Sequence, residues 1–161
     1  RDENGKFLRH KKLICEKVLA YDYNHDFALI KLRNPENKPL PLVSLAKLEN
    51  GPNVGTNAYI IGHPQALSWT KSSKKISTGP IVFNASNDSD FPHFLHLINT
   101  EGGHSGGPIF NMQGKLLGIH FRGIPHYSSG VETIIDGEAI TLKRFNVAID
   151  SKFIYERLIN Y

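Results

Sequence analysis

Short apolar runs, separated by glycine, asparagine and proline, make up most of this sequence. Each run has about the length of a β-strand and is too short for the helices of a helical bundle. Many short strands with such residues between them predict an all-β fold, either a barrel or a sandwich. The expected strands cover residues 13–20, 27–32, 56–62, 75–83, 93–99, 107–111, 115–121, 131–135, 138–142 and 145–149.

The residues between and after these runs add detail to the all-β prediction. Gln113-Gly114 and Asp136-Gly137 predict hairpin turns, because glycine adopts the positive φ that tight hairpins need. One helix is expected at the end of the chain, with Ser151 as its N-cap. The apolar residues of this helix recur at helical spacing: Phe153, Ile154, Leu158 and Ile159.

The composition limits the class of protein. A chain of 161 residues, of which 40% are hydrophobic and 21% charged, can form a domain with a real core. No apolar run reaches the roughly 18–20 residues of a membrane-spanning helix. The single cysteine, Cys15, excludes an internal disulfide framework and a cysteine-based zinc cluster. The formal charge of +4 is spread along the chain, so we expect no nucleic-acid partner. We also expect no membrane partner and no cofactor.

The first residues suggest that the natural protein has further sequence before Arg1. Asp2-Glu3-Asn4-Gly5 is a strong hairpin-turn signal, yet a single residue stands where the preceding strand is needed. A loose start with a chance Asn-Gly pair is the alternative. The sequence does not determine the cellular compartment of the protein, and secretion or export to the periplasm is one option.

The strongest chemical signal is the segment Thr100-Glu101-Gly102-Gly103-His104-Ser105-Gly106-Gly107-Pro108. A serine among small residues after a strand suits a nucleophile, because glycines permit a tight turn and the close approach of a substrate carbonyl. The amides of Gly103 and Ser105 can then form an oxyanion hole. The alternative is a glycine-rich turn with an incidental serine, but the apolar residues that follow the motif make the pattern more specific.

With this longer motif the sequence resembles the trypsin-like serine endopeptidases of the chymotrypsin fold. Asp26, followed by apolar residues 27–32, is similar to the segment around their catalytic aspartate, and the order Asp then Ser agrees with their triad. On its own, Asp26 would be a strand-initiating turn residue. Residues 59–64 and 146–149 resemble segments of the second barrel in bacterial members, including the HtrA-like group.

The resemblance implies a double β-barrel whose first barrel is truncated in this chain. Residues 1–48 would be the rest of that barrel and a linker, residues 49–149 the second barrel, and residues 150–161 a C-terminal helix. Ser105 would be the nucleophile of an endopeptidase that cleaves polypeptide substrates through an acyl-enzyme. Asp26 would orient the catalytic histidine.

Within this fold the sequence is most similar to the bacterial glutamyl-endopeptidase-like branch. There the threonine five positions before the serine and the histidine fifteen after it line the specificity pocket, and these are Thr100 and His120 here. Both can donate to a substrate carboxylate, which implies cleavage after acidic residues. Phe121 to Gly123 would pair with the substrate backbone. Without the resemblance, His120 would be a core histidine on an apolar strand.

The sequence offers no clear catalytic histidine. His25 is adjacent to Asp26, and neighbouring residues of a strand point to opposite faces. His10 lies in a polar, basic stretch, whereas the histidine of the resembled family follows an apolar strand. We therefore expect the histidine on a segment before Arg1, and we expect these 161 residues alone to be proteolytically inert or nearly so.

The other histidines do not predict a metal site. His93 and His96 are three residues apart on an expected strand, hence on opposite faces, and the metalloprotease motif is absent. His104 stands where the resembled family usually has Asn or Asp. Residues 130–145 look like an added hairpin beside the pocket.

Two alternatives to a glutamyl-type endopeptidase stay open at this stage. One is an HtrA-like protease that prefers a small aliphatic residue, against which His120 argues. The other is a proteolytically inactive trypsin-fold module that binds peptides. Glu101 also argues against acidic specificity, because a carboxylate next to Thr100 would repel an acidic side chain if it faced the pocket.

Overall fold

The computed structural model describes residues 13–33, 42–46, 51–64, 74–87, 90–124, 128–135 and 137–158. The chain forms two compact units, Arg1–Pro41 and Leu42–Tyr161. Some predictions concern residues outside the described ranges: the Asp2–Gly5 turn, His10, Asp136 and Ile159.

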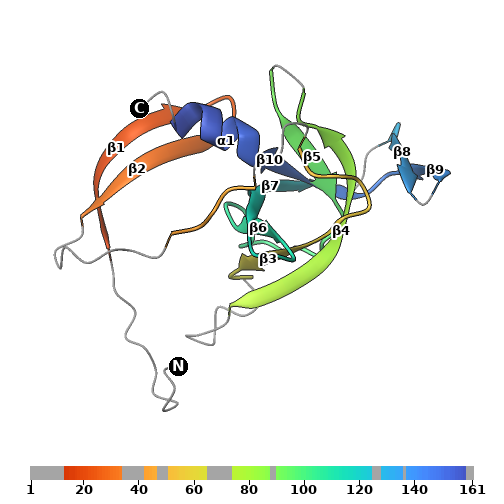
Figure 1. The fold of residues 1–161 in the computed structure, drawn as a ribbon, viewed down its shortest axis with the longest axis horizontal. Coiled ribbons are helices and arrows are strands. Elements are labelled where there is room, and N and C mark those ends of the chain that lie inside the picture. Colours follow the sequence, from red (N-terminus) through yellow and green to blue (C-terminus); the bar gives the residue numbers. More distant parts are fainter. Residues whose placement is uncertain are drawn as a thin grey trace, which may run out of the picture. The chain divides into compact units, whose positions relative to one another are not determined.

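The described part of the first unit is a β-hairpin (Figure 1). β1 (Ile14–Asp22) pairs antiparallel with β2 (Phe27–Arg33), which confirms the two strands expected there. The Asp22 carboxylate closes the turn by accepting the N–H groups of Asn24 and His25 at 3.1 and 3.2 Å. Its second oxygen lies 2.7 Å from His25 Nδ1. Asp26 ends the turn with a φ of 50°, a left-handed conformation that Asp tolerates better than most residues.

The second unit is a closed antiparallel β-barrel, in agreement with the all-β prediction (Figure 1). Its strands follow one another around the barrel in the order β10-β5-β4-β3-β6-β7, and β7 closes on β10. The strands are β3 (Asn57–Gly62), β4 (Lys75–Ala85), β5 (His93–His96), β6 (Pro108–Asn111), β7 (Leu116–Ile124) and β10 (Phe145–Asp150).

Alternating apolar residues of these strands fill the barrel. In β3 every second residue is buried, as expected for a strand with one face on a core. The resulting cluster consists of Ala46, Ala58, Ile60, Ile81, Phe94, Ile98, Ile109, Leu117 and Ala148.

A two-stranded hairpin precedes β10 in the chain. β8 (Val131–Ile135) and β9 (Glu138–Leu142) pair antiparallel, as the sequence predicted, with Gly137 at a φ of 84° between them. The Thr133 hydroxyl donates to the Val82 carbonyl of β4. Leu142 joins a second apolar cluster with Val82, Leu95, Phe145 and Val147. These contacts attach the hairpin to the barrel.

The helix α1 (Ser151–Leu158) follows β10 directly. The prediction that Ser151 caps this helix is wrong. Asp150 Oδ1 accepts the Lys152 N–H at 2.6 Å, which is the usual contact of an N-cap side chain, while the Ser151 hydroxyl lies 3.4 Å from the Ala46 carbonyl. Among the described residues, no helix is both long and apolar enough to cross a membrane.

Two strands differ in length from their predictions. β5 ends at His96 instead of residue 99, and Leu97, Ile98 and Asn99, which follow it, line a pocket. β7 continues past residue 121 to Ile124, because Arg122, Gly123 and Ile124 pair with β10. The sequence did not predict this extension, since Arg122 and Gly123 interrupt the apolar run.

Candidate active site

Ser105 is exposed and follows a tight turn of residues 101–104. The His104 N–H donates to the Glu101 carbonyl at 3.1 Å, and Gly103 has a φ of 101°. This φ is one that glycine adopts readily, which explains the need for glycine at this position of the turn. The turn therefore presents Ser105 to solvent between backbone segments that lack side chains.

The amides of Gly103 and Ser105 are the predicted oxyanion donors. Within the described ranges, neither amide donates a backbone hydrogen bond, whereas those of Gly106 and Gly107 do. Backbone N–H groups without an internal acceptor are the donors that a developing oxyanion requires. Their role remains a prediction.

The His104 ring fills the inside of the nucleophile turn, which we define as residues 101–105. Its Nδ1 lies 3.0 Å from the Glu101 carbonyl and 3.1 Å from the Glu101 amide nitrogen, so it bonds one or the other according to tautomer. The ring is fully buried, and its Nε2 has no hydrogen-bond partner among the described residues. Gly62 lies against it, since a Cβ there would be 2.6 Å from His104 Cδ2.

The nucleophile turn is joined to β7 through its next residues. The Gly106 N–H donates to the His120 carbonyl at 2.9 Å, and the His120 N–H donates to the Gly107 carbonyl at 2.9 Å. Both glycines have little space or an unusual backbone: Gly106 has a φ of 77°, and a Cβ on Gly107 would be 2.7 Å from the His104 carbonyl. The backbone hydrogen bonds of Gly106 and Gly107 thus connect the segment after Ser105 to His120.

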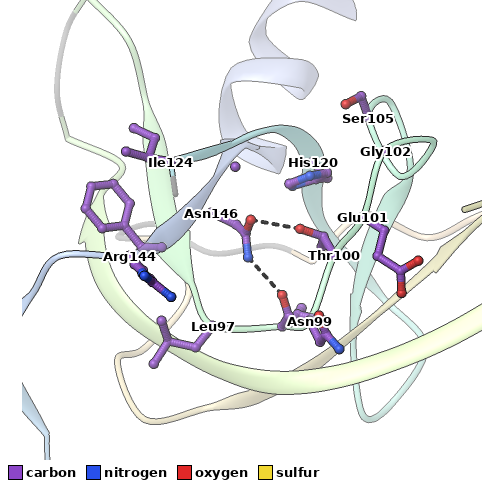
Figure 2. A pocket seen from close by; sticks show the side chains of 13 residues that line it. Leu97, Asn99, Thr100, Glu101, Gly102, Ser105, His120, Ile124, Arg144 and Asn146 are labelled. Carbon is purple, nitrogen blue, oxygen red and sulfur yellow. Dashed lines mark hydrogen bonds between the residues drawn. The ribbon is translucent and has the colours of Figure 1, made fainter. Parts of the chain in front are cut away.

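A pocket of about 630 Å³ opens beside Ser105 (Figure 2). Thr100, His120 and Gly123, which the sequence predicted as substrate-binding residues, all line it. The complete lining consists of Leu97, Ile98, Asn99, Thr100, Glu101, Gly102, Ser105, His120, Gly123, Ile124, Arg144, Phe145 and Asn146. The structure therefore places the predicted nucleophile and three of the predicted substrate-binding residues around one cavity.

Asn146 links two parts of the pocket wall (Figure 2). Its Nδ2 donates to the Ile98 carbonyl at 2.8 Å, and its Oδ1 accepts the Thr100 hydroxyl at 2.8 Å. Because the Ile98 carbonyl can only accept, it fixes the orientation of the amide. The Thr100 hydroxyl therefore donates its proton to Asn146.

His120 contacts a second buried histidine, His96. The Ile98 N–H donates to His96 Nδ1 at 3.3 Å, so the neutral His96 ring carries its proton on Nε2. That Nε2 lies 3.3 Å from His120 Nδ1. His120 is therefore both a pocket residue and a hydrogen-bonded core residue, which combines the two interpretations that its sequence allowed.

The surroundings of this pair keep both rings neutral. Burial, aided by the nearby His120, lowers the pKa of His96 to about 3. Burial also lowers the pKa of His120 to about 4, with a further decrease from His104 and a partial increase from the Val147 carbonyl. Both imidazoles are consequently uncharged near pH 7.

Glu101 is paired with a lysine. Its Oε1 lies 2.5 Å from Lys75 Nζ, at the start of β4, and this hydrogen bond lowers the pKa of the Glu101 carboxyl. In Figure 2 the carboxylate points away from Thr100 and Asn146. Lys75 thus balances the charge of Glu101, and the carboxylate does not face Thr100. Glu101 therefore gives less reason to exclude an acidic substrate side chain than its sequence position suggested.

Phe121, the remaining predicted substrate-binding residue, is not part of the pocket lining. It is the extra residue of a bulge in β7, since Arg122 pairs with Val147 and His120 with Ala148. Its ring packs edge-on against Phe91, at 5.7 Å between centroids. Bulges of this kind redirect neighbouring side chains, which here separates His120 from Phe121.

Asp26, the predicted catalytic acid, lies in the first unit, whereas Ser105 lies in the second. Asp26 is exposed at the end of its turn. His25 is held by Asp22 through its Nδ1. Neither observation tests the catalytic role of Asp26, which remains a prediction.

His93 and His96, which the sequence predicted on opposite faces of a strand, have different hydrogen-bond partners. His96 is buried against His120, whereas His93 bonds the Phe91 carbonyl at 2.6 Å. Among the side chains that the structure describes, no three His, Cys, Asp or Glu residues gather as metal ligands. Ser86 is buried, and its hydroxyl donates to Asp150.

Three residues of the site were not predicted from the sequence: His96, Arg144 and Asn146. Asn146 lies within the segment that resembles a closing strand, but nothing in that segment marks it as a pocket residue. Its place opposite Gly123 follows from the pairing of β10 with β7. The position of Asn146 in the pocket therefore depends on strand register, which short motifs do not encode.

Comparison with known proteins gives both a sequence family and curated relatives. Residues 2–119 match the profile of the trypsin-like peptidase domain. The glutamyl endopeptidase of Staphylococcus epidermidis is 26% identical over 137 residues, which cover 80% of this chain and 43% of that protein. The glutamyl endopeptidase of Staphylococcus aureus strain MRSA252 is 26% identical over 138 residues, or 81% of this chain and 36% of that protein. The chain thus spans about two fifths of these relatives.

Solved structures show the same fold. A serine endoprotease from Yersinia pestis has a TM-score of 0.62 at 18% identity, over 89% of this chain and 43% of that one. The active form of the Rv3671c protease from Mycobacterium tuberculosis has a TM-score of 0.59 at 18% identity, over 88% of this chain and 56% of that one.

Proposed function

Because the chain belongs to the trypsin-like peptidase domain family, we propose that the complete protein is a serine endopeptidase that cleaves after acidic residues. The observation that carries this proposal is the pocket beside Ser105, whose wall contains both Thr100 and His120. These residues stand at the two spacings from the serine that are typical of glutamyl-specific relatives. The names of the curated relatives support the same substrate class.

The proposed reaction begins with attack of Ser105 Oγ on the carbonyl before the scissile bond. A general base accepts the hydroxyl proton, and the amides of Gly103 and Ser105 stabilise the negative oxygen that forms. The base then gives its proton to the leaving amine, and an acyl-enzyme remains on Ser105. Water, deprotonated by the same base, hydrolyses this ester and restores the serine.

The general base of this mechanism is a histidine that we propose to lie outside these 161 residues. His25 does not suit the role, because its Nδ1 is engaged by Asp22 and it adjoins Asp26. In the proposed triad, Asp26 orients the histidine by accepting its second ring proton.

The nucleophile is tested by labelling the complete protein with a fluorophosphonate probe. We expect a modified Ser105 and no labelling of the Ser105→Ala variant. Labelling that persists in Ser105→Ala would reject the assignment, and the isolated 161 residues should label far more slowly because the serine lacks its base.

Specificity is tested by digesting a peptide library with the complete protein. We expect cleavage after Glu, then Asp, and a weaker preference in His120→Ala and in Thr100→Val. Dominant cleavage after Val, Ala, Arg or Lys would reject acidic specificity, and cleavage after small aliphatic residues would favour the HtrA-like alternative.

A further inference from the structure

The pocket beside Ser105 contains one positively charged side chain, Arg144, among the residues that line it. A carboxylate that leaves water for a pocket needs a partner that supplies charge as well as hydrogen bonds. His120 does not supply this charge near pH 7, because burial keeps its ring neutral. Thr100 is uncharged, and its hydroxyl donates to Asn146.

The negative charge of the pocket lining is already balanced. Glu101 is the one carboxylate among the lining residues, and it pairs with Lys75 at 2.5 Å. Within the described ranges, no carboxylate forms an ion pair with Arg144. Arg144 is an exposed residue of the pocket lining, and its guanidinium supplies a positive charge there that no described carboxylate balances through an ion pair.

The place of Arg144 follows from the start of β10. Phe145, the next residue, is buried in the second apolar cluster and pairs with Ile124 of β7. Asn146 then pairs with Gly123, so this end of β10 forms a wall of the pocket. In Figure 2, Arg144 lies on the opposite side of Asn146 from Thr100 and His120, at the end of the pocket away from Ser105.

We propose that Arg144 binds the side-chain carboxylate of the substrate residue that precedes the scissile bond. This inference rests on the proposed function and names the residue that distinguishes an acid from its amide. A planar guanidinium can form two parallel hydrogen bonds with a carboxylate, and it stays charged at all relevant pH values. Its location away from Ser105 suits the longer side chain of Glu better than that of Asp.

The test uses two peptide substrates that differ only in Glu or Gln before the cleaved bond. These side chains have nearly the same shape, so the ratio of their kcat/KM values measures recognition of charge. In Arg144→Gln of the complete protein, we expect this Glu/Gln ratio to fall about 10- to 100-fold, as expected for loss of a charged hydrogen bond. Arg144→Lys should keep part of the ratio, because it keeps the charge without the planar pair of donors.

The matched control is Lys143→Gln, which removes the same charge from the neighbouring exposed residue outside the pocket lining. This variant should keep the wild-type ratio. Titration with the fluorophosphonate probe corrects every rate for the fraction of folded, competent enzyme. A wild-type Glu/Gln preference that Arg144→Gln retains would overturn the role of Arg144. A wild-type enzyme without any preference for Glu would instead overturn the proposed function.

Discussion

At the scale of single residues, the chemistry of the pocket side chains is set by their neighbours. The Ile98 N–H fixes the tautomer of His96, and the Ile98 carbonyl fixes the orientation of Asn146. His96 in turn donates to His120, and Asn146 accepts from Thr100. The backbone N–H and carbonyl of Ile98 thus determine the hydrogen-bonding roles of His120 and Thr100, the two predicted specificity residues.

Burial of the two histidines predicts a pH-dependent stability. The pKa values of about 3 for His96 and about 4 for His120 lie below the usual 6.5, so the unfolded chain binds more protons below pH 6.5. The contribution of these neutral rings is therefore fully present above pH 6.5 and is lost as pH falls towards 4. Each ring contributes a slope of up to about 1.4 kcal/mol per pH unit.

His96→Gln should reduce this slope by the share of one ring, in urea unfolding of the complete protein between pH 6.5 and 4. Glutamine keeps an acceptor and a donor but does not titrate there. Ile109→Val serves as the control, since it weakens the same barrel core without a titratable group and should leave the slope unchanged. Equal slopes in His96→Gln and the wild type would contradict the explanation.

Some of the site residues that we predicted from a motif of fixed spacing lie around one cavity, while their roles stay predictions. Thr100, Ser105 and His120 stand in or near one glycine-rich motif, and the structure places them around one cavity. Asn146 belongs to β10, about forty residues further along the chain, and Arg144 directly precedes that strand. The contact of Asn146 with Thr100 depends on the register of β10 against β7, for which the local sequence gives no signal.

At the scale of elements, all the strands and the helix that the sequence predicted are present within the described residues. Several of their boundaries differ from the predicted ones. The helix begins one residue earlier than a Ser151 cap would place it, because the Asp150 carboxylate takes that role. Asp150 is also fully buried and is the last residue of β10. A local pattern therefore cannot show whether it ends the strand or caps the helix.

The contact between β3 and the nucleophile turn is the element-scale feature that is most open to a test. In Gly62→Ala, the new Cβ would lie 2.6 Å from His104 Cδ2 and 3.3 Å from its Cα, so the ring and the turn must move. Because this turn carries the predicted oxyanion amides, we expect kcat to fall at least about 10-fold, with a smaller change in KM. The measurement is steady-state cleavage of a Glu substrate by the complete protein.

Gly55→Ala is the control for this variant. Gly55 has a φ of 85° and open space around its Cβ position, so the change strains the backbone without touching the turn. It should lower stability by about 1 kcal/mol and leave kcat unchanged. Adding His104→Asn to Gly62→Ala should restore part of kcat by removing the crowded ring. Wild-type kcat in Gly62→Ala would reject the link between β3 and catalysis.

At the scale of the whole molecule, the predicted chemistry is divided between two units. The hairpin unit carries Asp26, and the barrel unit carries Ser105 together with the entire pocket. Short apolar runs were enough to predict the all-β class, and the resemblance around Ser105 was enough to predict the barrel fold. The proposed joint action of Asp26 and Ser105 stays a prediction, because no local pattern specifies tertiary contacts.

Asp26→Asn in the complete protein tests this division of labour. If Asp26 orients the catalytic histidine, the variant should fold normally and lose kcat by roughly 10⁴-fold, which is the size of the effect that the same change has in trypsin-like enzymes. Fluorophosphonate labelling of Ser105 should slow in parallel. Near-normal turnover would mean that another acid orients the base.

The reciprocal hydrogen bonds between His120 and the glycines after Ser105 set a fixed length within the molecule. In the proposed endopeptidase, this length separates the serine that attacks the scissile bond from the pocket wall that contacts the substrate side chain. Side chains at the distant end of the pocket, such as Arg144, can be exchanged without altering that length. For the proposed endopeptidase, exchange of such side chains would change which residue is recognised while the position of the cut stays constant, so the same barrel would serve proteases with different preferences and the same reaction geometry.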